Sequence, residues 1–208
     1  MFKKVLPLAT VSLMMLSLSA CSTPKNASEN TPKKAISSLQ SQAELKQDPQ
    51  VRLNFDNITT ATVEDNFKGG STLDDIKAIY GEPTSYETKP AGDVTLDVYV
   101  WKIDDVTINA QLFEDSTIAK SISNFAFDRK ATITKAIFDD KLSNDLTFSQ
   151  ATDILGFPDV MSQSVSSDGE HIQALWSSNL KGNQKGKQIE LNFKNGILSN
   201  KTQHGLKE

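Results

Sequence analysis

The chain has 208 residues, with 22 basic and 26 acidic side chains and a formal net charge of −4. Nucleic-acid binding depends on clustered Lys and Arg that neutralise phosphates, so this acidic balance argues against DNA or RNA as a partner. One cysteine is present, which excludes a disulfide within the chain, and the fold must be stabilised by apolar burial.

The N-terminus has the pattern of an export signal. Two lysines precede the apolar run Val5–Ala20, which contains Pro7 and falls short of the ~20 residues that a spanning helix needs. Cys21 follows directly after Leu18-Ser19-Ala20, and this arrangement resembles the lipobox of bacterial lipoproteins. The resemblance implies cleavage after residue 20 and acylation of Cys21, with palmitate among the acyl chains. The alternative is an ordinary secretory signal with a cysteine at its cleavage site.

A lipidated Cys21 predicts where the protein works. Each buried methylene of an acyl chain contributes roughly 0.8 kcal/mol, so several chains form a lasting anchor. We therefore expect a protein tethered to the extracytoplasmic face of the cell membrane. Loss of the two N-terminal lysines leaves 20 basic against 26 acidic residues, a charge of −6. Anionic headgroups would then add little to the attachment.

Residues 22–50 are rich in Ser, Lys, Asn, Gln and Pro and contain no aromatic residue. Such a segment cannot bury enough apolar surface to offset its chain entropy, so we expect a flexible spacer.

From residue 51 onward the chain repeats itself at an offset of 75 residues. Segment 72–83 aligns with 147–158, where Thr, Ile, Gly and Pro coincide, and Trp101 aligns with Trp176. The predicted organisation is a signal peptide at 1–20, a lipidated cysteine and spacer at 21–50, one repeat at 51–127 and a second at 128–208.

Helix boundaries are marked in both repeats. Thr72 and Thr147 are each followed three residues later by Asp or Gln, which is the capping-box pattern. Gly81 and Gly156 supply the left-handed residue that ends a helix, and a proline follows each two residues later.

Alternating strand-like segments follow each helix, and Asn195-Gly196 favours a two-residue hairpin. A less distinct helical segment precedes each capped helix, at 55–67 and 133–142. The expected fold is α+β: two tandem helix-helix-three-strand repeats that form an antiparallel sheet with the helices on one face.

This doubled unit behind a lipobox resembles the β-lactamase-inhibitor-like repeat, and especially uncharacterised lipoproteins of low-GC Gram-positive bacteria. The resemblance rests on 147–158, Trp176 and the closing segment 199–206. It implies sheets placed side by side and a sheet face that binds a partner protein. The secreted inhibitor has disulfides and an enzyme-inserting loop that this chain does not match, so inhibition of a β-lactamase is not expected from it.

No catalytic or metal-binding motif is evident in the sequence. His171 and His204 are the only histidines, and no G-x-S-x-G or H-E-x-x-H string occurs. The paired aspartates at 74–75, 104–105 and 139–140 lack the spacing of a calcium loop and fit a helix start, a turn and a solvated surface. We predict no catalytic residues, no metal and no cofactor.

Tyr99, Trp101 and Trp176 are the candidate partner contacts, because aromatic residues are favoured at binding hot spots. The alternative is that they pack where the helices meet the sheet. If Val98 and Val100 face the helices, Tyr99 and Trp101 face outward.

The sequence thus predicts a non-enzymatic, membrane-anchored module that binds a protein or envelope component. One alternative is a structural or assembly factor of an envelope complex. Another is a cell-wall hydrolase, which would need an acid/base pair in a cleft.

Overall fold

The computed structural model describes residues 34–35, 41–43, 47–129, 132–182 and 186–208. Cys21 and the predicted signal peptide lie outside these ranges. The helices of the described ranges are α1 (Pro49–Phe55), α2 (Leu73–Tyr80), α3 (Lys135–Lys141) and α4 (Phe148–Leu155). The strands of the main sheet are β3 (Ser85–Ala91), β4 (Val94–Ile103), β5 (Val106–Phe113), β6 (Ser116–Ser123), β8 (Val160–Ser166), β9 (Gly169–Trp176), β10 (Gln188–Lys194) and β11 (Ile197–His204).

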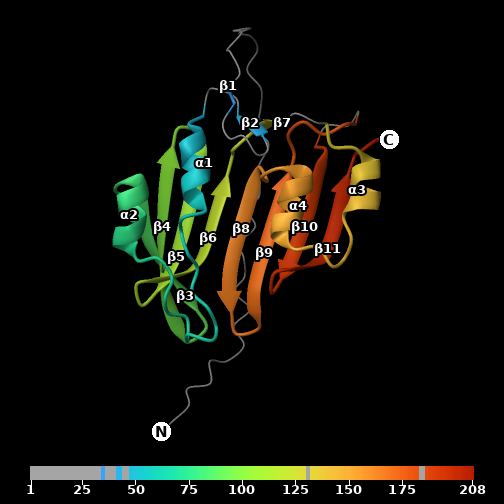
Figure 1. Ribbon diagram of the computed structural model, residues 1–208. Helices are drawn as coiled ribbons and strands as arrows, with labels where there is room; N and C mark the ends of the chain where they lie inside the picture. Colours follow the sequence, from blue (N-terminus) through green and yellow to red (C-terminus); the bar gives the residue numbers. More distant parts are fainter. Residues whose placement is uncertain (1–33, 36–40, 44–46, 130–131, 183–185) are drawn as a thin grey trace.

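These eight strands form one open antiparallel sheet in the order β11-β10-β9-β8-β6-β5-β4-β3. Figure 1 shows the helices on the same side of this sheet. Three short strands pair separately in the order β1-β2-β7: β1 (Lys34–Ala35), β2 (Ser41–Ala43) and β7 (Phe127–Arg129).

The predicted α+β fold of helix-helix-three-strand repeats is wrong. The described chain is mainly β, and each half of the sheet has four strands, β3–β6 and β8–β11. The prediction of three strands per repeat is one strand too few in each half. β3 is an edge strand that contains Pro90 and charged residues, and β6 and β8 are rich in serine, so none carries the usual apolar alternation of a strand.

The helix expected at 55–67 is also wrong, because α1 ends at Phe55. α1 begins with Asp48 as N-cap and Pro49 in its first turn, inside the stretch predicted to be spacer. The two capped helices are confirmed. Thr72 and Thr147 each form a complete capping box, and Gly81 (φ 76°) and Gly156 (φ 77°) end α2 and α4.

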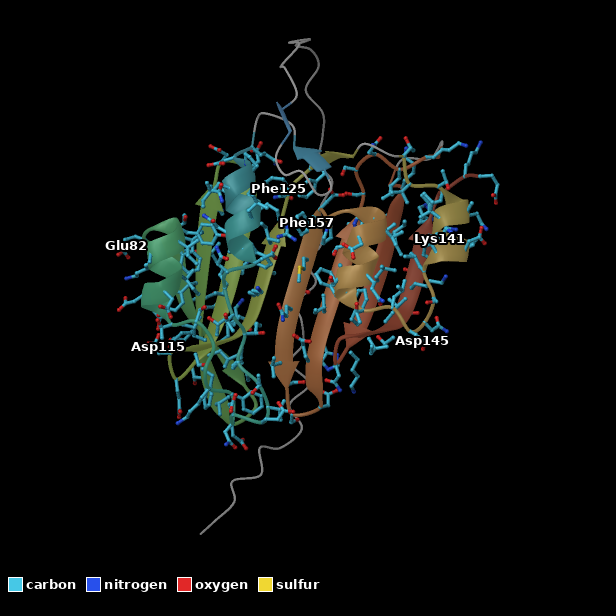
Figure 2. All side chains as sticks on the ribbon, in the orientation of Figure 1. Glu82, Asp115, Phe125, Lys141, Asp145 and Phe157 are labelled. Carbon is cyan, nitrogen blue, oxygen red and sulfur yellow. The ribbon has the colours of Figure 1, made fainter. Side chains whose placement is uncertain are left out.

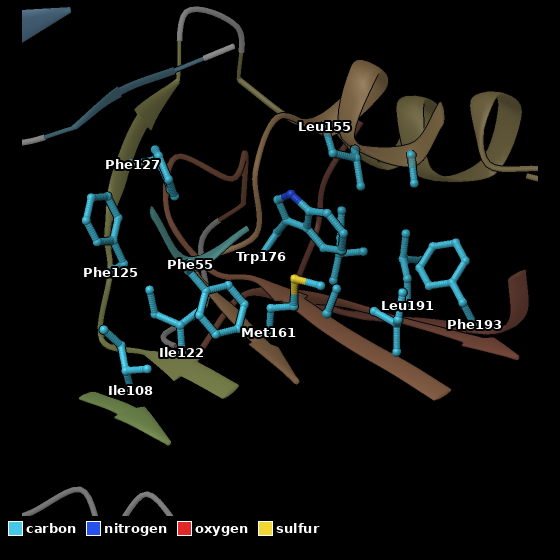
Figure 3. Packing of buried hydrophobic residues seen from close by; sticks show 14 of the residues in the cluster. Phe55, Ile108, Ile122, Phe125, Phe127, Leu155, Met161, Trp176, Leu191 and Phe193 are labelled. Atoms are coloured by element: carbon cyan, nitrogen blue, oxygen red, sulfur yellow. The ribbon is translucent and has the colours of Figure 1, made fainter. Parts of the chain in front are cut away.

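The two halves of the sheet share one core. β6 pairs with β8 from Ala119–Ser164 to Ile122–Met161, which joins the halves without a break. One buried residue of each main-sheet strand from β4 to β10 lies in register on the side that faces the helices: Trp101, Ile108, Ile122, Met161, Ala174 and Leu191. Figure 3 labels Ile108, Ile122, Met161 and Leu191 of this row. Asp159, 3% exposed, ties the connection between the halves to the end of β9, because it accepts hydrogen bonds from the backbone of Phe127, Ser177 and Ser178.

Each half attaches its helices to the sheet with matching contacts. The indole N–H of Trp101 donates to the carbonyl of Gly81 at 2.9 Å, and that of Trp176 donates to the carbonyl of Gly156 at 2.9 Å. These bonds satisfy a carbonyl at the end of α2 and of α4, where the helix itself offers no donor.

Two lysines donate hydrogen bonds to carbonyl groups at the C-terminal ends of α1 and α3. Lys120 Nζ donates to the carbonyls of Phe55 (3.2 Å) and Ile58 (2.5 Å), and Lys201 Nζ donates to those of Phe138 (3.0 Å) and Leu142 (2.7 Å). A cation near a helix C-terminus is stabilised by the helix dipole.

Candidate protein-interaction surface

The sheet face opposite the helices carries a row of neutral polar side chains. Residues directly opposite in neighbouring strands share a face, and the register connects one residue of every strand from β3 to β11. We call this set the polar row: Ser85, Val100, Asn109, Ser121, Ser162, Gln173, Asn192 and Asn200. Its members are half-buried or exposed, and all but Val100 have donors and acceptors that a partner could use.

Some side chains of this face are held in place by their neighbours. Asn109 Nδ2 donates to Ser121 Oγ at 3.3 Å within the polar row. Glu190 accepts from Gln173 (2.8 Å) and Asn192 (3.1 Å), so one carboxylate orders two amides of the row. Side chains fixed before binding lose less entropy when a partner arrives.

Charged residues lie at one end of the same face. Asp168 pairs with His171 Nε2 (3.2 Å) and Lys194 Nζ (3.1 Å), and His171 and Lys194 are directly opposite each other in β9 and β10. Hydrogen bonds from Ser166, Lys194 and His171 hold the pKa of Asp168 well below its usual range. His171 therefore lies against the Asp168 carboxylate at the surface of the sheet.

The structure buries the two predicted tryptophan contacts. Trp101 is 1% exposed and Trp176 is 0% exposed, and both lie under the helices, so neither indole is available to a partner. The condition that Val98 and Val100 face the helices is wrong. They pair with Gln111 and Asn109 on the helix-free face. Tyr99 is half-buried on the helix side.

The polar row was missed by the sequence analysis. A partial signal exists in the alternation of polar and apolar residues in β5, β9 and β10. The row itself depends on strand register between segments far apart in sequence, which alternation alone does not supply.

In the part of the chain that the structure describes, no group of three or more His, Cys, Asp or Glu side chains is placed to hold a metal ion. None of the described helices has the length and apolar character needed to cross a membrane.

The fold and this surface define a mainly-β protein whose described helices all lie on one face of the sheet. Residues 47–206 match the family described as Domain of Unknown Function with solved-structure structure (DUF3862), and the chain belongs to that family. The chain is also similar to a crystal structure from Streptococcus mutans described as a "putative beta-lactamase inhibitor protein", with 42% identity and a TM-score of 0.71. The match covers 78% of this chain and 99% of that chain. No match was found among curated proteins. This similarity confirms the predicted resemblance to β-lactamase-inhibitor-like proteins.

Proposed function

We propose that this protein is a non-enzymatic binding module that holds a protein partner on the helix-free face of its sheet, at the cell membrane. The observation that carries the proposal is the polar row, which supplies neutral hydrogen-bonding side chains, some of them ordered by their neighbours, from seven of the eight strands. The similarity to the inhibitor-like protein of Streptococcus mutans supports a binding role over catalysis.

Site-specific photo-crosslinking tests the binding face. A benzophenone amino acid at Asn200 or Gln173, both on the polar row, is expected to give a discrete adduct with a protein in intact cells. The matched control is the same label at Asp153, on the exposed side of α4. Adducts from Asp153 alone, or equal adducts from all three positions, would contradict the assignment of the face.

The membrane anchor is the second part of the proposal, and it rests on the lipobox-like segment that ends at Cys21. Replacing Cys21→Ser removes the acylated thiol, so the variant is expected to leave the membrane fraction and appear in the soluble fraction. Retention of the variant in washed membranes would refute the anchor while leaving the binding face untouched.

Inhibition of a β-lactamase is a second candidate function, favoured by the 42% identity to the Streptococcus mutans protein. Purified protein is expected, on this candidate, to slow hydrolysis of a chromogenic cephalosporin by a class A β-lactamase in a saturable way. An unchanged rate at a large excess of the protein would remove the candidate.

A further inference from the structure

An exposed tyrosine on the edge strand is stacked on a second tyrosine. Tyr86 of β3 is 55% exposed, and its ring lies 4.9 Å from that of Tyr99 on β4, with 28° between the planes. The two residues are directly opposite each other in the β3–β4 register. The hydroxyl of Tyr86 donates to Asp97 Oδ1 at 2.7 Å, which fixes the outer ring and a carboxylate together.

The stacked pair rests on the core. The Tyr99 ring is 6.2 Å from buried Trp101, and Trp101 is 6.4 Å from Tyr80 of α2. The hydroxyl of Tyr80 donates to the carbonyl of Val51, so this inner end is fixed as well. A rigid aromatic surface of this kind binds a partner at a small cost in conformational entropy.

The second half of the sheet has no such surface at the corresponding place. The offset that aligns Trp101 with Trp176 aligns Tyr86 with Met161 and Tyr99 with Ala174, which are also directly opposite each other. Both are buried, because β8 lies in the middle of the sheet beside β6. It also aligns Asp97 with buried Ile172. The two tyrosines and the carboxylate are therefore a feature of the β3 edge of the sheet and have no counterpart at the aligned positions of the second half.

The surroundings of the pair are acidic. Burial, followed by the Asp97 and Asp115 carboxylates, raises the pKa of Tyr99, and Lys77 lowers it. Lys77 is itself paired with Glu82 at 3.0 Å, so its charge is balanced. Glu82 and Asp115 lie along the edge of the molecule beside α2 (Figure 2). The Asp97 and Asp115 carboxylates thus leave net negative charge beside the exposed ring of Tyr86.

The backbone of β3 is less suited to binding than its side chains. Pro90 lacks an N–H, and Glu87 and Lys89 are charged, which are features that discourage addition of another strand to an edge. A partner at this edge therefore binds mainly through side-chain contacts.

We propose that Tyr86, Tyr99 and Asp97 bind an arginine side chain of a protein partner. The planar guanidinium stacks on the Tyr86 ring, and its N–H groups donate to the oxygen of Asp97 that Tyr86 leaves free. Arginine fits better than lysine, because only the guanidinium combines stacking with a forked set of donors. The site lies at the sheet edge on the helix side, whereas the polar row lies on the other face. This inference rests on the proposed protein-binding function and adds a second contact surface, with its own partner chemistry, to that function.

Peptide titration followed by NMR tests the site directly. Acetyl-Gly-Arg-Gly-amide is expected to shift the ring resonances of Tyr86 and Tyr99 in a saturable way, whereas acetyl-Gly-Gln-Gly-amide is not. Tyr86→Ala and Asp97→Asn are each expected to weaken the arginine peptide by about threefold or more. Tyr86→Phe, which keeps the ring, is the control expected to retain binding.

Equal responses to the arginine and glutamine peptides, or to the arginine peptide and acetyl-Gly-Lys-Gly-amide, would overturn the proposal, as would unchanged affinity in Tyr86→Ala. Failure of the arginine site can be distinguished from failure of the proposed binding function. Crosslinking from Asn200 or Gln173 with no arginine-specific response would leave the binding module intact and remove only this site. Spectra of each variant confirm that the fold is retained.

Discussion

Lys120 makes hydrogen bonds that stabilise the fold, but its burial disfavours the charged form of its side chain. Its ammonium group satisfies two carbonyls after α1 and lies 4.7 Å from the centre of the Phe55 ring. It is also 6% exposed, and burial lowers its pKa to about 8 from 10.5. Lys201 makes the equivalent contacts in the second half, with the Phe138 ring at 4.8 Å.

The lowered pKa of Lys120 predicts a pH dependence of stability. The unfolded chain binds this proton more tightly than the folded chain, so the free energy of unfolding should rise between pH 7.5 and 9.5. We expect a gain of roughly 1 to 2 kcal/mol relative to Lys120→Met, which lacks the titrating group. Urea unfolding across this range measures it. The range stops below pH 10 because burial raises the pKa of Tyr80, whose ionisation in the unfolded chain then opposes folding. Parallel curves for the two proteins would contradict the prediction.

At the scale of the element, local sequence decides where α2 and α4 begin and end. Thr72 exchanges hydrogen bonds with Asp75, and Thr147 does so with Gln150. The two partners of each pair lie within one turn of the same helix. Such contacts form regardless of the rest of the chain, which is why these helices were predicted correctly. The number of strands in each half was not, because strands such as β3, β6 and β8 are stabilised by pairing with other segments more than by their own composition.

Removal of either cap should weaken the fold. Thr72→Ala and Thr147→Ala each delete one capping box and are expected to cost about 1 kcal/mol in the free energy of unfolding. Ser149→Ala is the matched control, since Ser149 is exposed in the first turn of α4 and alanine favours helix. Denaturant midpoints compare the three variants, and a loss from Ser149→Ala equal to that of the cap variants would argue against a specific capping effect.

At the scale of the whole molecule, we expect the β6–β8 pairing and the shared core to make the two similar halves unfold as one cooperative unit. A residue row that runs from Trp101 to Leu191 cannot be opened in one half without exposing the other. Asp159 strengthens the same junction through its bonds to Phe127, Ser177 and Ser178.

The two tryptophans allow this cooperativity to be measured, one in each half. In Trp176→Phe only Trp101 reports, and in Trp101→Phe only Trp176 reports. Each variant is expected to lose about 1 to 3 kcal/mol, because a helix-end carbonyl loses its donor. The loss should be larger in Trp176→Phe, because Gly156 is buried whereas Gly81 is exposed. Within each variant, tryptophan fluorescence and far-ultraviolet circular dichroism should give the same urea midpoint. Different midpoints for the two probes would show that the halves unfold separately.

The sequence by itself determined the features that form within a few residues. These are the capped starts of α2 and α4, the glycines that end them and the Asn195-Gly196 hairpin, where both residues have positive φ. It also aligned Trp101 with Trp176, and the structure gives both the same hydrogen bond. Only the tertiary structure decided the four-stranded halves, the burial of the tryptophans, the polar row and the exposure of Tyr86 where its counterpart Met161 is buried. The physical reason is that a strand's register and its place at the centre or edge of a sheet depend on partners far away in the chain, whereas a cap or a tight turn carries its own hydrogen bonds.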